Sequence, residues 1–130
     1  MERDPTTAAE LHALVAQWPE EARPKDLDYD PPRPTTPAHI PWEWWVYARS
    51  EKCGGFHART PISQAHAIDL HVASAHKYLI EGGWSVVCSK SRDGMYRVSN
   101  LNHSMVFIAP TLFLATHSAI LSTQKGAVHE

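Results

Sequence analysis

Apolar side chains recur at helical spacing through residues 60–83. The members that share one stripe, at about 100° per residue, are Ala65, Ile68, Val72, Ala75 and Leu79. Thr60 can cap the first turn, Pro61 suits the first helical position, and Gly82 suits the C-terminal end. The pattern therefore predicts a helix over residues 61–81 whose apolar face must be covered by another part of the chain.

A second apolar stripe lies near the N-terminus, within residues 4–18. Its members, spaced at i, i+3, i+4 and i+7, are Leu11, Leu14, Val15 and Trp18. Thr7 and Glu10 have the spacing of a capping box. We expect segment 1–18 to form an N-terminal amphipathic helix that docks through its leucine and tryptophan edge.

Residues 42–49 are rich in aromatic and β-branched side chains and contain no glycine, which is typical of a strand. Because side chains alternate along a strand, Trp42 and Trp44 point to one face, whereas Trp45 and Tyr47 point to the other. Large apolar groups on both faces indicate a central strand covered on both sides, or a strand that is covered on one face and exposes an adhesive apolar surface on the other.

Asp93-Gly94 is a dipeptide typical of a two-residue type I′ turn, and it predicts a hairpin between strands at residues 84–90 and 95–100. A further strand is expected at residues 104–109, ended by a proline. The order of strand, helix, strand, turn and strand is a βαββ unit, in which an antiparallel sheet carries the helix on one face.

The remaining segments define the domain organisation. Seven of the ten prolines lie in residues 19–41, which predicts an extended connector without regular elements, and a loop is expected at residues 50–60. Residues 42–124 should form a single α+β domain with three to four strands, completed by a C-terminal helix or strand at residues 111–123. We expect residues 125–130 to fray.

Composition narrows the classes of function without selecting one. The 130 residues are 43% hydrophobic and 20% charged, as in ordinary globular proteins, and the net charge of −2 gives no overall attraction to nucleic acid. Cys53 and Cys88 are too few for a disulfide framework, and the chain does not begin with a secretory pattern. These features favour a cytoplasmic protein with reduced thiols and no membrane partner.

Nine histidines raise the question of a metal site. His66, His71 and His76 are spaced by five residues, so each is rotated by roughly 140° from the last on a helix and one ion cannot bind all three. The chain has no paired ligand motif of the zinc-binding type. We therefore expect neither a metal nor another cofactor.

Catalytic signatures are weak. Asp69 with His66 or His76, near Cys53, could supply acid–base groups for a small metal- or Cys/His-dependent enzyme. The competing interpretation places Asp69 at the rim of the apolar face and makes His76 an ordinary histidine at the edge of the core.

Five tryptophans are more than a core of this size requires, and aromatic side chains are favoured at interfaces. The sequence therefore predicts a small non-enzymatic protein that binds a protein partner through Trp42, Trp44, Trp45 and Tyr47. An accessory or inhibitory protein, such as viruses use, would fit this description, and self-association through the same surface is an alternative.

The second prediction is a nucleic-acid-binding module. In a hairpin closed by Asp93-Gly94, Lys90 faces Arg97, and Arg92 lies beside them at the tip. Arg49 and the aromatic strand would extend this basic surface. Binding of this kind would weaken steeply with salt.

Overall fold

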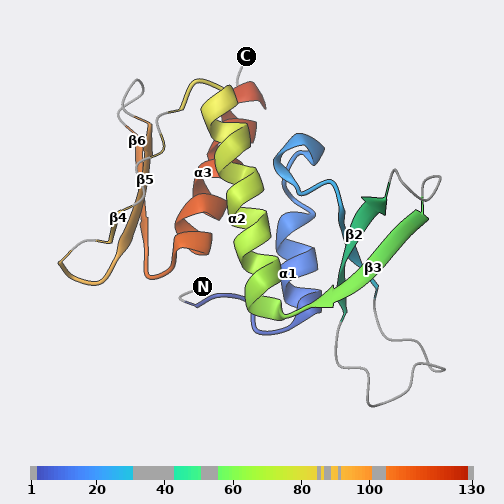
Figure 1. Cartoon of the computed structure of the whole chain (residues 1–130). Coiled ribbons are helices and arrows are strands. Elements are labelled where there is room, and N and C mark those ends of the chain that lie inside the picture. Colours follow the sequence, from blue (N-terminus) through green and yellow to red (C-terminus); the bar gives the residue numbers. More distant parts are fainter. Residues whose placement is uncertain are drawn as a thin grey trace.

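The computed structural model describes residues 3–30, 43–50, 56–84, 86, 89–90, 92–100 and 105–128. Across these ranges the elements in chain order are α1 (Ala8–Val15), the 3-10 turn η1 (Glu20–Ala22), β1 (Leu27–Tyr29), β2 (Trp44–Ser50), β3 (Phe56–Ile62), α2 (Gln64–Glu81), β4 (Ser89–Lys90), β5 (Tyr96–Asn100), β6 (Met105–Ala109) and α3 (Leu112–Val128). The three helices lie side by side, with one antiparallel sheet beyond α1 and another beyond α3 (Figure 1). The predicted α+β class, with an N-terminal and a C-terminal helix, is confirmed.

The strands form two sheets rather than the single sheet expected. The first sheet has the order β1-β2-β3 and the second has the order β4-β5-β6. The central position of β2 is confirmed, because it pairs with β1 on one side and with β3 on the other. Both edges of β2 are therefore occupied, and the later hairpin must form its own sheet.

β3 begins within the segment 50–60, which the sequence predicts as a loop, and includes its residues 56–60. It pairs with β2 from Ser50↔Phe56 to Trp44↔Ile62, so Pro61 lies in a strand and not at the start of a helix. A proline is tolerated there because β3 is an edge strand of the first sheet.

The helix α2 begins later than predicted and ends as predicted. Its N-cap is Ser63 rather than Thr60, and the Ser63 hydroxyl accepts a hydrogen bond from the backbone N–H of His66 at 3.1 Å. Glu81 is the last helical residue. The left-handed conformation beyond it belongs to Gly83, at φ +92°, and not to Gly82.

The N-terminal helix is shorter than predicted but docks as expected. The hydroxyl of Thr7 accepts a hydrogen bond from the N–H of Glu10 at 3.1 Å and caps α1. The three side chains that anchor α1 and its following turn in the core are Leu11, Val15 and Trp18.

The proline-rich connector contains two short elements, which contradicts the expectation of none. Pro19 precedes η1, and Ala22 in that turn is fully buried where η1 packs against α2. β1 then follows and pairs with β2, including the pair Tyr29↔Trp44. Residues 20–29 therefore form a strap that contacts α2 through η1 and pairs with the first sheet through β1.

The hairpin of the second sheet forms with a register that differs by one residue from the prediction. Lys90 pairs with Tyr96 rather than with Arg97, because β4 ends at Lys90 and β5 begins only at Tyr96. Gly94 has φ +82°, as a turn of this kind requires. Lys90 and Arg97 consequently project from opposite faces of the sheet.

The second sheet is covered by α3, and α2 packs against the other side of α3 (Figure 1). The strand predicted at residues 104–109 is confirmed as β6. The C-terminal segment at residues 111–123, predicted as a helix or a strand, forms part of the helix α3. α3 continues to Val128, beyond the residue where fraying was expected to begin. The side chains that fill this layer without exposure include Val98, Ala115, Ala119 and Ile120.

Candidate functional site

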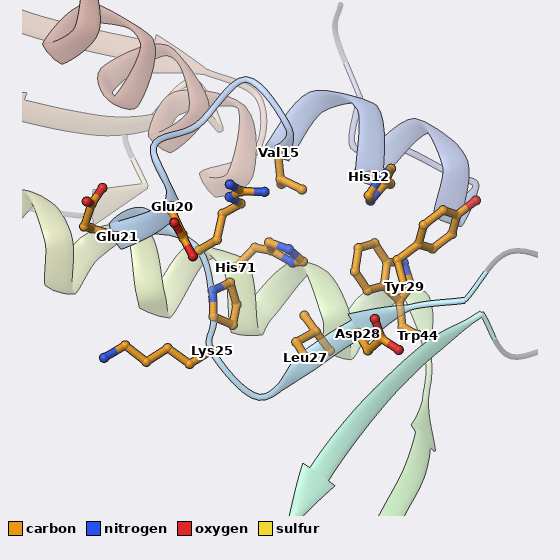
Figure 2. Close-up of a pocket in the computed structure, with 12 residues that line it drawn as sticks. His12, Val15, Glu20, Glu21, Lys25, Leu27, Asp28, Tyr29, Trp44 and His71 are labelled. Atoms are coloured by element: carbon orange, nitrogen blue, oxygen red, sulfur yellow. The ribbon is translucent and has the colours of Figure 1, made fainter.

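A cavity of about 590 Å³ lies between α1, the strap formed by η1 and β1, and α2 (Figure 2). Its inner wall includes His12 from α1, Arg23 from the strap, Tyr29 from β1, Trp44 from β2 and His71 from α2. Four separate segments of the chain, namely α1, the strap, β2 and α2, therefore contribute to one cavity.

Local structure explains how the strap presents its side chains. Burial of Ala22 against α2 fixes the end of η1. The next residue, Arg23, is therefore held at the cavity wall, which its side chain lines. In β1 the alternation of side chains turns Leu27 and Tyr29 to the same side as their partners in β2, of which Trp44 is buried. This side of the first sheet closes one end of the cavity.

His71 is the most deeply buried polar group of the cavity, with 2% of its surface exposed. Its Nδ1–H donates to the carbonyl of Ala67, one helical turn earlier, at 2.7 Å. Nδ1 therefore carries the proton, and Nε2 keeps its lone pair without a hydrogen-bond partner among the residues that the structure describes.

Burial lowers the pKa of His71 to about 4. The hydrogen bond to Ala67 opposes this shift, whereas the nearby Arg23 and His12 add to it. The imidazole is consequently neutral at pH 7 and offers the cavity a hydrogen-bond acceptor.

Aromatic rings form a rigid frame around His71. Trp44 and Trp18 meet its ring edge-on, with centroids 5.1 and 6.1 Å away and an interplanar angle of 75° in each case. Tyr29 stacks on His12 at 4.4 Å and contacts Trp44 at 5.2 Å. Burial raises the pKa of Tyr29, with a smaller contribution from Glu43, so its hydroxyl stays protonated at neutral pH. Ring pairs of this kind stabilise a fixed geometry.

Two donors of the inner wall have no acceptor. The Trp44 side chain is 4% exposed, and its buried Nε1–H has no hydrogen-bond partner within the described part of the chain. The Nε–H of half-buried Arg23 is likewise buried and unpaired. Leaving a buried donor without a partner costs about 1–3 kcal/mol, and native proteins contain few such groups.

Two carboxylates and the lysine of the cavity lining are exposed. These residues are Glu20, Glu21 and Lys25, and the side chains of Glu21 and Lys25 extend away from His71 (Figure 2). Asp28 is half-buried and accepts a hydrogen bond at Oδ2 from the Tyr47 hydroxyl at 3.2 Å. Arg23 and Asp28 are thus the half-buried ionisable side chains of the lining besides Tyr29, and Arg23 forms no ion pair within the described residues.

The cavity frame is anchored to α3 through a second set of histidines. Trp18 Nε1–H donates to Nδ1 of His117 at 2.8 Å, and the Trp18 ring stacks on Phe113 at 5.8 Å. Nε2 of His76 shares a hydrogen bond with the Thr116 hydroxyl at 3.0 Å. Burial lowers the pKa of both His117 and His76. His76 therefore links α2 to α3, and His117 links the turn after α1 to α3.

The weak catalytic set predicted from sequence is distributed over different environments. His76 lies in the interface with α3, whereas His66 and Asp69 are exposed on α2. Cys53 lies outside the described residues. Among the residues that are described, no three histidine, cysteine, aspartate or glutamate side chains gather into a group that could hold a metal ion.

The predicted partner-binding residues divide between two faces of β2. Trp44 is buried in the cavity wall, whereas Trp45 and Tyr47 are half-buried on the opposite face of the strand. Trp42 lies outside the described residues.

The predicted basic residues do not share one face of the second sheet. Lys90, Arg92 and Arg97 are exposed. The Lys90 ammonium lies 5.9 Å from the ring centroid of Tyr96, its partner across the strands, while Arg97 projects from the other face. Arg49 lies in β2, and its side chain is not among those that the structure describes.

Four cavity residues were not expected from sequence as site residues: His12, Arg23, Tyr29 and His71. A signal was present for His71, because it lies three residues after Ile68 and four before Ala75, and a polar residue buried beside this apolar stripe needs a partner. Arg23 and Tyr29 lie among prolines and charged residues and carry no comparable signal.

No helix of the described chain combines the length and apolar character needed to cross a membrane. Comparison of the sequence with protein-family models and with curated proteins, and of the fold with solved structures, found no match.

Proposed function

We propose that this chain is a non-enzymatic binding protein that holds a small molecule in the cavity between α1, the η1–β1 strap and α2. The observation that carries the proposal is the cavity itself, whose most deeply buried polar group is neutral His71. A bound molecule that donates a hydrogen bond to Nε2 of His71 would pair this acceptor.

The size and rigidity of the cavity support a small molecule. A volume of about 590 Å³ lies within the range of roughly 300–1,000 Å³ that is usual for such sites. Most of the inner wall consists of rings that already contact one another, including His12 on Tyr29. Little side-chain entropy would therefore be lost on binding.

The chemistry of His71 favours binding over catalysis. A general base works best with a pKa near the operating pH, and a pKa of about 4 makes His71 a weak base at pH 7. Its Nδ1 is held by a backbone carbonyl and not by a carboxylate that would stabilise a protonated ring.

A fragment screen by saturation-transfer NMR tests the proposal. Leu27 lines the cavity, so Leu27→Trp should fill it, whereas the exposed Val106 on β6 provides the control substitution Val106→Trp. We expect flat aromatic fragments to bind the wild-type protein and Val106→Trp but not Leu27→Trp. Fragments that bind all three proteins equally, or a wild-type protein that binds none, would contradict the proposal.

The protein-binding function predicted from sequence is the second candidate, and its surface is now narrower. Trp45 and Tyr47 lie on the face of β2 opposite Trp44, and Trp45 has Pro61 as its cross-strand neighbour. This aromatic face points away from the cavity side of the first sheet. An affinity pull-down tests this function. A partner that wild-type protein and Arg97→Ala recover, and that Trp45→Ala loses, would support it. Equal recovery of the partner by all three proteins would refute it.

A further inference from the structure

We infer that the ligand of the cavity is a flat organic acid whose carboxylate is bound by the guanidinium of Arg23. The inference rests on the proposed small-molecule function and names the chemical class of the ligand. It follows from the state of Arg23, from the charges around it, and from the uncharged His71 deeper in the cavity.

Arg23 is a half-buried cation without an acidic partner. Its Nε–H is buried and unpaired, and no carboxylate of the described chain forms an ion pair with it. Buried charges in proteins are normally paired, because removal from water is costly. A carboxylate matches the planar fork of a guanidinium and can accept two parallel hydrogen bonds from it.

The described carboxylates near Arg23 do not form an ion pair with it. Glu20 and Glu21, on the turn immediately before Arg23, are exposed to solvent. Asp28 accepts a hydrogen bond from Tyr47. The one ion pair identified in the described residues joins Arg3 to Glu10, outside the cavity lining. Because no described carboxylate forms an ion pair with Arg23, a bound molecule can supply the anionic group.

The remaining inner wall defines the body of the ligand. Nε2 of His71 provides an acceptor, so a second polar group on the ligand can donate a hydrogen bond to it. The surrounding rings of Tyr29, His12 and Trp44 favour a flat apolar body. A neutral analogue would fill the same space but would leave the charge of Arg23 unpaired.

Matched acids and amides separate the contribution of the ligand carboxylate to the affinity from that of its flat apolar body. The probes are benzoate, indole-3-acetate and 2-naphthoate, each compared with its neutral amide, titrated at pH 7 into ¹⁵N-labelled protein and followed by chemical-shift changes. We expect each acid to bind at least about tenfold more tightly than its amide, the equivalent of about 1.4 kcal/mol. Cavity residues such as His71 and Trp44 should report the shifts.

Three variants identify the contribution of Arg23. Arg23→Gln should weaken the acids at least about tenfold and leave the amides within about twofold, whereas Arg23→Lys, which keeps the charge but loses the fork, should give an intermediate value. Lys25→Gln removes the same charge from an exposed position at the cavity mouth and should change little. Amide spectra of each variant report whether the fold is retained.

The outcomes distinguish the inference from the function on which it rests. Amides that bind as tightly as acids, or acids that bind Arg23→Gln as well as they bind wild type, would overturn the organic-acid inference and leave the binding cavity intact. If none of the six probes shifts the signals of cavity residues, both the organic-acid inference and the proposed binding function are overturned.

Discussion

Replacement of His71 by asparagine should remove a specific part of the pH dependence of stability. The side-chain amide nitrogen of the new asparagine would occupy nearly the place of the histidine Nδ1, so donation to the Ala67 carbonyl can be kept. The substitution removes Nε2 and leaves no group at position 71 that can take up a proton in this pH range. The pH dependence of the free energy of unfolding therefore isolates the titration from the general cost of the substitution.

The magnitude follows from the pKa of His71, which burial lowers from 6.5 in the unfolded chain to about 4 in the folded protein. Between these values the unfolded chain binds the proton more readily, so the unfolded state gains stability as the pH falls. The contribution of neutral His71 is complete above about pH 6.5 and is lost progressively toward pH 4. A difference of about 2.5 pKa units corresponds to about 3 kcal/mol.

Urea unfolding followed by tryptophan fluorescence, repeated in steps from pH 7.5 to pH 4, measures this quantity. The wild-type protein should lose about 3 kcal/mol more than His71→Asn over this range. Arg23 and His12 face His71, and Glu20, Glu21, Lys25, Asp28 and Tyr29 complete the titratable and charged lining. These groups and the buried His76 and His117 are common to both proteins, so their contributions largely cancel. Parallel stability curves for the two proteins would refute a buried, neutral His71.

Three further substitutions test the packing and the turns by urea unfolding at pH 7. Trp18→Phe keeps most of the ring but removes donation to Nδ1 of His117, and should cost about 1 kcal/mol relative to wild type, whereas no loss would show that this hydrogen bond is not formed. Leu79→Ala, at a fully buried position of α2, should cost about 2–5 kcal/mol, and its neighbour Ile80→Ala, 58% exposed, should cost less than about 0.5 kcal/mol. Gly94→Ala forces a side chain into φ +82° and should cost about 1–2 kcal/mol, more than Gly82→Ala at φ −84°; equal costs would contradict the turn conformation.

The sequence predicts the elements whose patterns are local. The apolar stripe of α2, the cap at Thr7 and the aromatic run of β2 each identify an element from neighbouring residues. The start of α2 is misplaced because Thr60-Pro61 and Ser63 are both acceptable beginnings, and only pairing with β2 assigns Pro61 to a strand. The division into two sheets depends on the same pairing, which is not local.

The cavity could not be predicted from sequence because its wall is assembled from distant segments. Tyr29 and Trp44 meet as partners in neighbouring strands, and His12 and His71 approach them from two different helices. The aromatic run draws attention to Trp44, but only the folded arrangement turns it inward and leaves its indole N–H without an acceptor. The spacing of the three α2 histidines correctly argues against one shared ion, yet it does not reveal that His71 alone lies deep in the fold.

The central claim is that Trp44 faces a ligand site, and the indole N–H signals of the five tryptophans test it most directly. In a ¹H–¹⁵N spectrum of the labelled protein, Trp44→Phe identifies the signal of interest by its disappearance. Addition of 2-naphthoate should shift the Trp44 indole signal, because the naphthalene ring would lie against the Trp44 side chain in the cavity wall, and should leave the Trp45 signal in place. A Trp44 signal that stays fixed while the Trp45 signal moves would place the binding surface on the opposite face of β2 and contradict the account.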